Sequence, residues 1–154
     1  MIKLLIATRN GGKVREYRDL LSKYKLDLYT LKDFPNYVEP PEDQDTFEKN
    51  ALKKAQHAAD ALNILTLADD SGLVVPALNG QPGVFSRRFA GADATDAENR
   101  FKLKGLLKTL QEGERSGFFA CSIALCQPFK CLKVVLAQCE GELLLEERGT
   151  HGFG

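Results

Sequence analysis

Two short segments of the sequence concentrate side chains that could bind phosphate and a divalent cation. The first follows an apolar run at 2–7 and consists of Thr8, Arg9, Asn10, Gly11, Gly12 and Lys13. A loop between a strand and a helix presents backbone N–H groups and the positive end of the helix dipole. The two glycines allow a ligand to approach the backbone closely, and the two basic side chains add charge. We interpret this loop as a candidate anion site.

The same loop differs from the P-loop of many nucleotide-binding proteins. Val14 follows Lys13, where that pattern requires Ser or Thr, and no glycine stands at the required earlier position. An ordinary strand-to-helix turn with solvated charges explains the local sequence equally well. Taken alone, the loop therefore indicates neither a particular ligand nor a reaction.

The second segment places two adjacent carboxylates, Asp69 and Asp70, after the apolar run 64–68 and before Ser71 and Gly72. Mg²⁺ is usually held by one or two carboxylates together with substrate phosphates, and a carboxylate can also deprotonate an attacking water. Successive side chains on a strand point to opposite faces. If the strand stays extended, one aspartate faces the site and the other braces backbone or loop. A polar turn is the alternative, because Asp-Ser-Gly clusters are common in turns.

An acidic stretch before the second predicted helix adds the carboxylates of Glu39, Glu42, Asp43 and Asp45. Most of them fit a solvated loop, since residues 33–45 also contain three prolines. Asp45 and Glu48 resemble a helix cap and its third-position partner. Asn50 and Lys54 are four residues apart, so they share one face of the predicted helix.

The apolar periodicity predicts the elements that must position these side chains. Strands are predicted at 2–7, 26–31, 64–68, 118–126 and 131–139, with a strand or extended arm at 72–78 and a possible strand at 141–147. Helices are predicted from Lys13, from the cap at Asp45, and from Thr95, where Glu98 stands three residues later. Both faces of 118–126 are apolar, so this strand is expected to lie centrally, covered on both sides. A mixed sheet with helices on its faces is the natural architecture.

Two of the predicted helices carry apolar stripes at helical spacing. The first stripe comprises Phe47, Ala51, Leu52, Ala55, Ala59 and Leu62. The second comprises Phe101, Leu103, Leu106, Leu107 and Leu110. Both helices are therefore expected to pack an apolar face against the sheet.

The charge balance, apolar runs, cysteines and histidines of the sequence argue against several classes of protein. The 154 residues include 21 Lys and Arg and 21 Asp and Glu, and this balance argues against a nucleic-acid or membrane-surface binder. No apolar run is long enough to cross a membrane and the N-terminus lacks a signal-peptide pattern, so a cytoplasmic protein is expected. None of the four cysteines forms a C-x-x-C pair, which favours buried free thiols. Only His57 and His151 could serve a catalytic triad, and they are far apart in sequence.

Considered together, the segments resemble the inosine triphosphate pyrophosphatase family, which acts on non-canonical purine nucleoside triphosphates. The matching segments, in chain order, are 7–13, 46–51, 54–55, 68–73, 82–91, 93–99 and 148–154. Each segment alone is a weak signal. The ordered set spans nearly the whole chain and is highly specific.

The resemblance implies an α/β fold with a long, mixed, curved sheet flanked by helices and two lobes around a nucleotide cleft. It implies a single domain over 1–154, usually assembled as a homodimer. It further implies Mg²⁺-dependent hydrolysis of ITP, dITP or XTP to the monophosphate and pyrophosphate, with attack at the α-phosphorus. A purine nucleoside triphosphate is then the partner, rather than nucleic acid or a membrane.

Roles follow from the resemblance by position. Residues 8–13 match the triphosphate-binding loop. Asp70 matches the family's catalytic acid residue, acting as general base and metal ligand, and Glu42 matches a second metal-site acid. The remaining substrate contacts by position are Ser71, Phe153 and Gly154.

The sequence also departs from the family pattern. His151 stands where the family commonly has glycine. The family's Tyr-Asp-Pro, lysine and Ser-His-Arg motifs, which grip the base and the phosphates, do not follow Gly154. We therefore expect a form of the family domain that lacks its C-terminal part. Two alternatives stay open: an inactive nucleotide-binding remnant, and a related pyrophosphatase of the septum-inhibition type, acting on pyrimidine or modified nucleotides.

Overall fold

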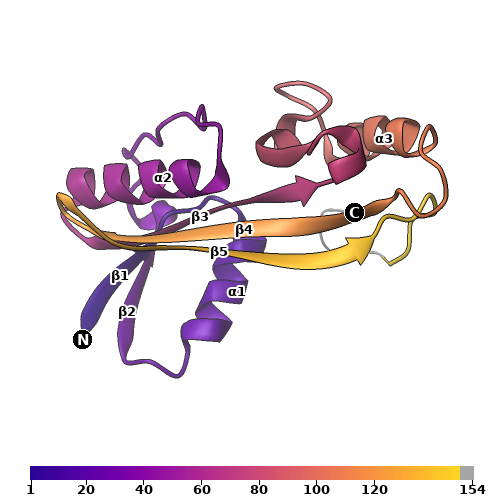
Figure 1. Ribbon diagram of the computed structural model, residues 1–154. Helices are drawn as coiled ribbons and strands as arrows, with labels where there is room; N and C mark the ends of the chain where they lie inside the picture. Colours follow the sequence, from indigo (N-terminus) through magenta and orange to yellow (C-terminus); the bar gives the residue numbers. More distant parts are fainter. Residues whose placement is uncertain (150–154) are drawn as a thin grey trace. The chain divides into compact units, whose positions relative to one another are not determined.

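A five-stranded mixed sheet with the order β2-β1-β3-β4-β5 organises the chain (Figure 1). The computed structural model describes residues 1–149. The strands are β1 (Ile2–Ile6), β2 (Leu26–Thr30), β3 (Leu65–Val74), β4 (Ser116–Gln127) and β5 (Lys130–Glu142). The helices are α1 (Gly11–Leu21), α2 (Phe47–Leu62) and α3 (Asp96–Leu107), with short 3-10 turns at Leu31–Asp33, Pro76–Leu78 and Gly83–Arg88. The prediction of a mixed α/β sheet with helices is confirmed, and β4 lies inside the sheet as expected. Its two faces are not equally covered: Ala120, Ser122, Ala124 and Cys126 are buried, whereas the residues that alternate with them are half-buried or exposed.

The pairing of β1 explains why distant segments of the chain meet. β1 runs parallel to β2 on one side and to β3 on the other, and parallel neighbours require crossover connections, here through α1 and α2. Ile6 is in register with Leu67, and the N–H of Ala7 donates to the carbonyl of Leu67 over 2.8 Å. The loop after β1 therefore lies beside the middle of β3, where Asp69 and Asp70 stand.

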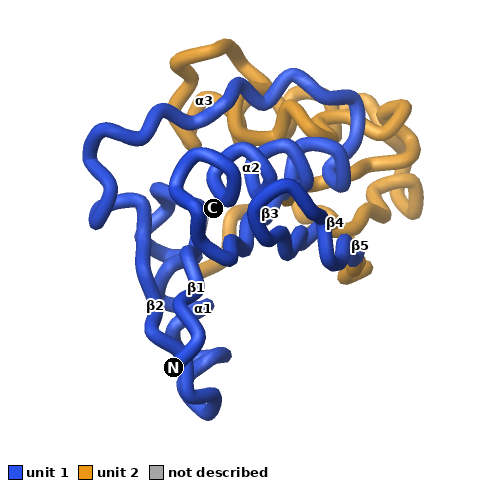
Figure 2. The backbone as a smooth tube through the Cα atoms, turned by 90° about the vertical axis from the view of Figure 1, so that its left-hand side faces the viewer, with its two compact units in different colours: residues 1–70, 122–136 blue, residues 71–121, 137–154 orange. Residues whose placement is uncertain are grey.

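Two compact units divide the described chain (Figure 2). The first contains residues 1–70 and 122–136, and the second contains residues 71–121 and those from 137 onward. The division falls inside β3, between Asp70 and Ser71. The strands β3, β4 and β5 therefore contribute residues to both units.

Alanines of α2 form much of the core of the first unit. The fully buried alanines of this helix are Ala51, Ala55, Ala58 and Ala59. They cluster with Leu5 of β1 and Ala124 of β4, while Leu52 and Leu62 pack against the cluster partly buried. Small side chains allow the helix to approach the sheet closely, so close packing is reached without large residues. The apolar stripe predicted for this helix is confirmed.

Two local predictions in the first unit were wrong. Thr46, and not Asp45, caps α2, because its side chain accepts the N–H of Lys49 over 3.2 Å, whereas Asp45 pairs with the Lys49 ammonium over 2.8 Å. The predicted interruption between 64–68 and 72–78 is absent from β3, which runs from Leu65 to Val74. Asp69 and Asp70 thus lie within an extended strand and not in a polar turn.

The second unit contains α3 and the 3-10 turns that precede it. Thr95 and Glu98 form the predicted capping box, with the Thr95 N–H donating to the Glu98 carboxylate over 2.7 Å. The apolar stripe predicted for this helix is only partly buried: Leu107 is buried, Leu103, Leu106 and Leu110 are half-buried, and Phe101 is 82% exposed. The possible strand at 141–147 was wrong, since β5 ends at Glu142 and residues 143–149 form no strand.

The position of β5 at the sheet edge explains why the prediction for the cysteines held only in part. All four thiols are free, as predicted. Cys126 is buried and Cys121 half-buried, but Cys131 and Cys139 are exposed, because the side chains of β5 are mostly exposed. Within residues 1–149, no helix combines the length and apolar character needed to cross a membrane.

Candidate active site

Asp70 is a buried carboxylate held by a side chain of α2. It is 7% exposed, and its Oδ2 accepts a hydrogen bond from Asn50 Nδ2 over 2.9 Å. Asn50 is itself 1% exposed, and its Oδ1 accepts the backbone N–H of Gln44 over 3.0 Å. One buried amide therefore fixes the carboxylate and also ties down the acidic loop before α2.

Lys54, one helical turn beyond Asn50, brings Glu42 toward the same carboxylate. Its Nζ lies 2.8 Å from Glu42 Oε1 and 3.9 Å from Asp70 Oδ1. The Lys54 side chain is 13% exposed and that of Glu42 is 31% exposed. The two acids to which the resemblance assigns the metal thus share one ammonium group, although 28 positions separate them in the sequence.

The charges around Asp70 act in opposite directions on its pKa. Burial raises the pKa of Asp70 above the ordinary value for an aspartate, and the Lys54 ammonium and the Asn50 hydrogen bond lower it. The Glu42 carboxylate adds a rise and the Lys13 ammonium a further reduction. The net pKa is raised, so at neutral pH Asp70 is a stronger proton acceptor than a solvated aspartate.

Asp69 faces a different partner from its neighbour. Its Oδ2 lies 2.5 Å from the Nζ of Lys13, in the first turns of α1. Its Oδ1 is buried and has no hydrogen-bond partner among residues 1–149. Alternation along β3 sends the two aspartates to opposite faces, and Figure 1 shows α1 and α2 on opposite sides of the sheet. The sequence prediction that the two carboxylates cannot do the same job agrees with these contacts.

The loop 8–13 forms the cap of α1. Asn10 is the N-cap, and its Oδ1 accepts the N–H of Gly12 over 2.9 Å and that of Lys13 over 3.2 Å. Thr8 Oγ1 accepts the N–H of Asn10 over 3.2 Å. A Cβ on Gly12 would lie 3.1 Å from Asn10 Oδ1, so this tight turn favours glycine. Two N–H groups proposed to receive an anion are thus already bound by the Asn10 side chain.

The remaining residues assigned from the resemblance are distributed as follows. Arg9 binds Glu39, with Nε 2.5 Å from Oε2, and donates to the Tyr37 carbonyl over 3.2 Å. Ser71 follows Asp70 in β3 but belongs to the second unit. Phe153 and Gly154 lie outside the described residues. The structure therefore brings together loop 8–13, Asp69, Asp70 and Glu42, all in the first unit.

Residues 1–149 contain no cluster of three or more His, Cys, Asp or Glu side chains arranged to hold a metal. Glu42 and Asp70 nevertheless fit a divalent cation, because both are oxygen ligands and already attract one cationic group between them. Mg²⁺ characteristically uses one or two carboxylates and completes its shell with water and substrate phosphates. The donor set therefore suits a metal that arrives with a phosphorylated ligand.

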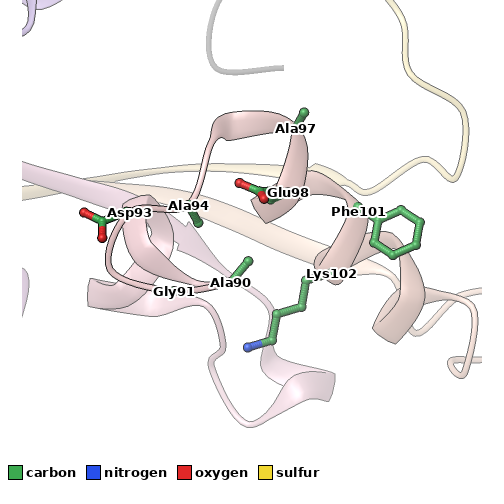
Figure 3. Close-up of a pocket in the computed structure, with 8 residues that line it drawn as sticks. All are labelled: Ala90, Gly91, Asp93, Ala94, Ala97, Glu98, Phe101 and Lys102. Carbon is green, nitrogen blue, oxygen red and sulfur yellow. The ribbon is translucent and has the colours of Figure 1, made fainter.

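A pocket lies elsewhere, in the second unit (Figure 3). It has a volume of about 780 Å³ and is lined by Ala90, Gly91, Asp93, Ala94, Ala97, Glu98, Phe101 and Lys102. Besides Asp93, its charged side chains are Glu98 and Lys102, and both have structural roles: Glu98 closes the capping box of α3, and Lys102 Nζ donates to the Phe89 carbonyl over 2.6 Å. We therefore place the candidate chemistry at the carboxylates of the first unit, where Asp70 is buried and held by Asn50.

Sequence reasoning did not include Asn50 and Lys54 among the site residues. Their spacing on one helix face was visible, as was the unusual placement of an amide within an alanine-rich stripe. A buried polar residue needs a hydrogen-bond partner, and this requirement was the signal that could have identified Asn50. Its partner could not be found from spacing alone, because Asp70 lies 20 positions away on another element.

Comparisons with known proteins agree with these features. A "Ham1 family" model matches residues 4–154. The "dITP/XTP pyrophosphatase" of Protochlamydia amoebophila is 45% identical over 99% of this chain and 78% of its own length. The enzyme of the same name from Geobacter sulfurreducens is 46% identical over 100% of this chain and 77% of its own length.

Solved structures show the same similarity. The HAM1 protein of Coxiella burnetii superposes with a TM-score of 0.90 at 38% identity, covering 100% of this chain and 79% of that protein. The Ham1 protein of Staphylococcus aureus superposes with a TM-score of 0.83 at 35% identity. The resemblance first indicated by the ordered motifs is confirmed, and with a match along 4–154 and this shared fold the chain belongs to the Ham1 family.

Proposed function

We propose that this chain hydrolyses dITP, ITP and XTP to the nucleoside monophosphate and pyrophosphate. The names of its relatives support the substrate class. The observation that carries the proposal is the buried Asp70, fixed by Asn50 and sharing the Lys54 ammonium with Glu42. A pre-oriented basic carboxylate beside a second acid suits metal-assisted attack by water on a phosphate.

In this mechanism Asp70 accepts the proton of the attacking water. The water oxygen forms a bond to the α-phosphorus, and the bond from that phosphorus to the bridging oxygen of pyrophosphate breaks. Asn50 keeps the Asp70 carboxylate oriented, and burial keeps its pKa raised. Mg²⁺, held by Asp70 and Glu42, would supply charge neutralisation for the phosphates. Lys13 and the loop 8–13 bind the triphosphate, with Asp69 fixing the Lys13 ammonium.

Ser71, Phe153 and Gly154 complete the proposal as substrate contacts carried over from the family. The single domain over 1–154, the nucleotide cleft between two lobes and the homodimer stay predictions. Sedimentation of the purified chain tests the dimer, and a monomer at micromolar concentration would contradict it.

The assay for the proposed function identifies the released phosphate species. The purified chain with ITP and Mg²⁺ should release pyrophosphate, and the rate with ITP or XTP should exceed that with GTP. Release of orthophosphate alone would overturn the proposal. Binding of ITP by calorimetry without turnover would favour the non-catalytic remnant, and preference for pyrimidine nucleotides would favour the septum-inhibition type.

A further inference from the structure

The ammonium group of Lys54 occupies the neighbourhood of the two acids assigned to the metal. It lies 2.8 Å from Glu42 Oε1 and 3.9 Å from Asp70 Oδ1. The Lys54 side chain is only 13% exposed and extends from α2, the helix that also supplies Asn50. A cationic group is therefore held beside both carboxylates by a helix whose alanine face is packed in the core.

Lys54 and a divalent cation would compete for the charge of the same two carboxylates. A metal bound to Glu42 shares the negative charge of this carboxylate with the Lys54 ammonium, which already binds Oε1. Two positive groups a few ångströms apart also repel each other, and the repulsion is stronger in a poorly hydrated site than in water. Metal without any added negative charge therefore meets an opposing charge at this site.

A triphosphate changes this balance. Its negative charges can compensate the metal and the lysine together, so the ammonium no longer opposes the metal to the same degree. Asp69 does not replace Glu42 in this role, because its Oδ2 binds the Lys13 ammonium. The local charges thus favour metal that enters with phosphate over metal that enters alone.

We propose that Lys54 is the internal counter-cation of the site. It neutralises Glu42 and Asp70 in the nucleotide-free chain, disfavours free Mg²⁺, and makes the metal–nucleotide complex the species that binds. The inference rests on the proposed function, because that function assigns the metal to these two acids. It goes further by naming the residue that determines the form in which the metal enters.

The test measures Mn²⁺ binding to the full chain without nucleotide, by electron paramagnetic resonance of the free ion. Lys54→Met and Lys54→Gln should each tighten the Mn²⁺ Kd by at least about tenfold, equal to about 1.4 kcal/mol. Lys54→Arg, which keeps the charge, should stay within about threefold of the parent chain. An ITP analogue with a methylene group between the α- and β-phosphorus should reduce the tenfold difference in Mn²⁺ Kd between the parent chain and Lys54→Met.

Lys53→Met is the matched control. Lys53 is the preceding residue of α2 and pairs with Asp43 over 2.6 Å, in a more exposed position. This variant loses one positive charge from the same helix without touching Glu42 or Asp70, and its Mn²⁺ Kd should stay at the parent value. Thermal melting of every variant checks that α2 remains folded.

Three results would overturn the inference. The first is an Mn²⁺ Kd of Lys54→Met that is equal to or higher than that of the parent chain. An absence of Mn²⁺ binding in both proteins counts as this result. The second is equal tightening in Lys54→Arg, which would exclude charge as the cause. The third is tightening that survives Glu42→Gln in the Lys54→Met background, because the ion would then be bound elsewhere. The pyrophosphate assay on the parent chain decides the proposed function separately.

Discussion

The Nζ of Lys13 lies 2.5 Å from Oδ2 of Asp69, a carboxylate that is only 3% exposed. The pair links the first turns of α1 to the middle of β3 and fixes the helix whose N-terminus presents the candidate phosphate loop. The next residue, Asp70, is held by Asn50 of α2. Two adjacent aspartates therefore connect one strand to two helices. The cationic partner of Asp69 is Lys13 and that of Asp70 is Lys54.

Replacement of Asp69 should reveal a strongly coupled pair. Asp69→Asn leaves the Lys13 ammonium without its counter-charge and should lower the free energy of unfolding by about 3 kcal/mol. Combining it with Lys13→Met should cost less than the sum of the two single changes, because both remove the same interaction. Urea unfolding of the four chains measures the coupling. Strict additivity would show that the ion pair contributes no net energy.

Replacement of Asp70 should separate catalysis from stability. Asp70→Asn removes the proton acceptor but keeps a side chain of the same shape beside Asn50. Pyrophosphate release from ITP should fall by about 10²–10⁴-fold. The melting temperature should change little or rise, because the variant no longer buries a charged carboxylate. A nearly normal rate would remove Asp70 from the mechanism.

Replacement of Asn50 should lower the rate of hydrolysis because Asp70 loses the hydrogen bond that orients its carboxylate. Asn50→Ala removes the hydrogen bonds to Asp70 and to the Gln44 N–H, and should cost about 1–3 kcal/mol of stability. The pyrophosphate rate should also fall, since Asp70 loses its orienting partner. Lys49→Ala, an exposed change on the same helix that removes only the pair with Asp45, should cost no more than about 0.5 kcal/mol. Equal effects of the two changes would contradict the assigned role.

Tyr37 should make the chain sensitive to alkaline pH. Burial, with the Glu39 charge, raises the pKa of Tyr37 to about 12, and its hydroxyl contacts His57 Nδ1 over 2.8 Å. The unfolded chain releases this proton near pH 10, so stability from the neutral hydroxyl is fully present below pH 10 and is lost between about pH 10 and 12. The loss should amount to roughly 1–3 kcal/mol.

Tyr37→Phe provides the comparison for this prediction. The variant should be less stable at pH 7 by about 1 kcal/mol, because the hydrogen bond to His57 is lost. Its stability should then fall less steeply than that of the parent chain from pH 10 to 12, which urea titrations at several pH values would measure. Parallel curves for the two proteins would exclude Tyr37 as the titrating group.

The sequence by itself determined most of the secondary structure and the membership of the family. The strand at the N-terminus, the Thr95–Glu98 cap and the alanine stripe of α2 follow from local rules of periodicity and capping. The ordered motifs carried the family resemblance, because their order along the chain is visible without any structure. Local rules failed at Asp69 and Asp70, where a turn-like composition lies within a continuous strand.

Only the tertiary structure decided which charged groups meet. The pairing of β1 with β3 brings Lys13 to Asp69, 56 positions away, and the packing of α2 brings Asn50 and Lys54 to Asp70. The spacing of residues along the sequence is equally consistent with solvated carboxylates, because the interaction between two charges depends on their distance in space. Burial then makes these pairings obligatory, because a carboxylate removed from water needs a hydrogen bond or a cation beside it.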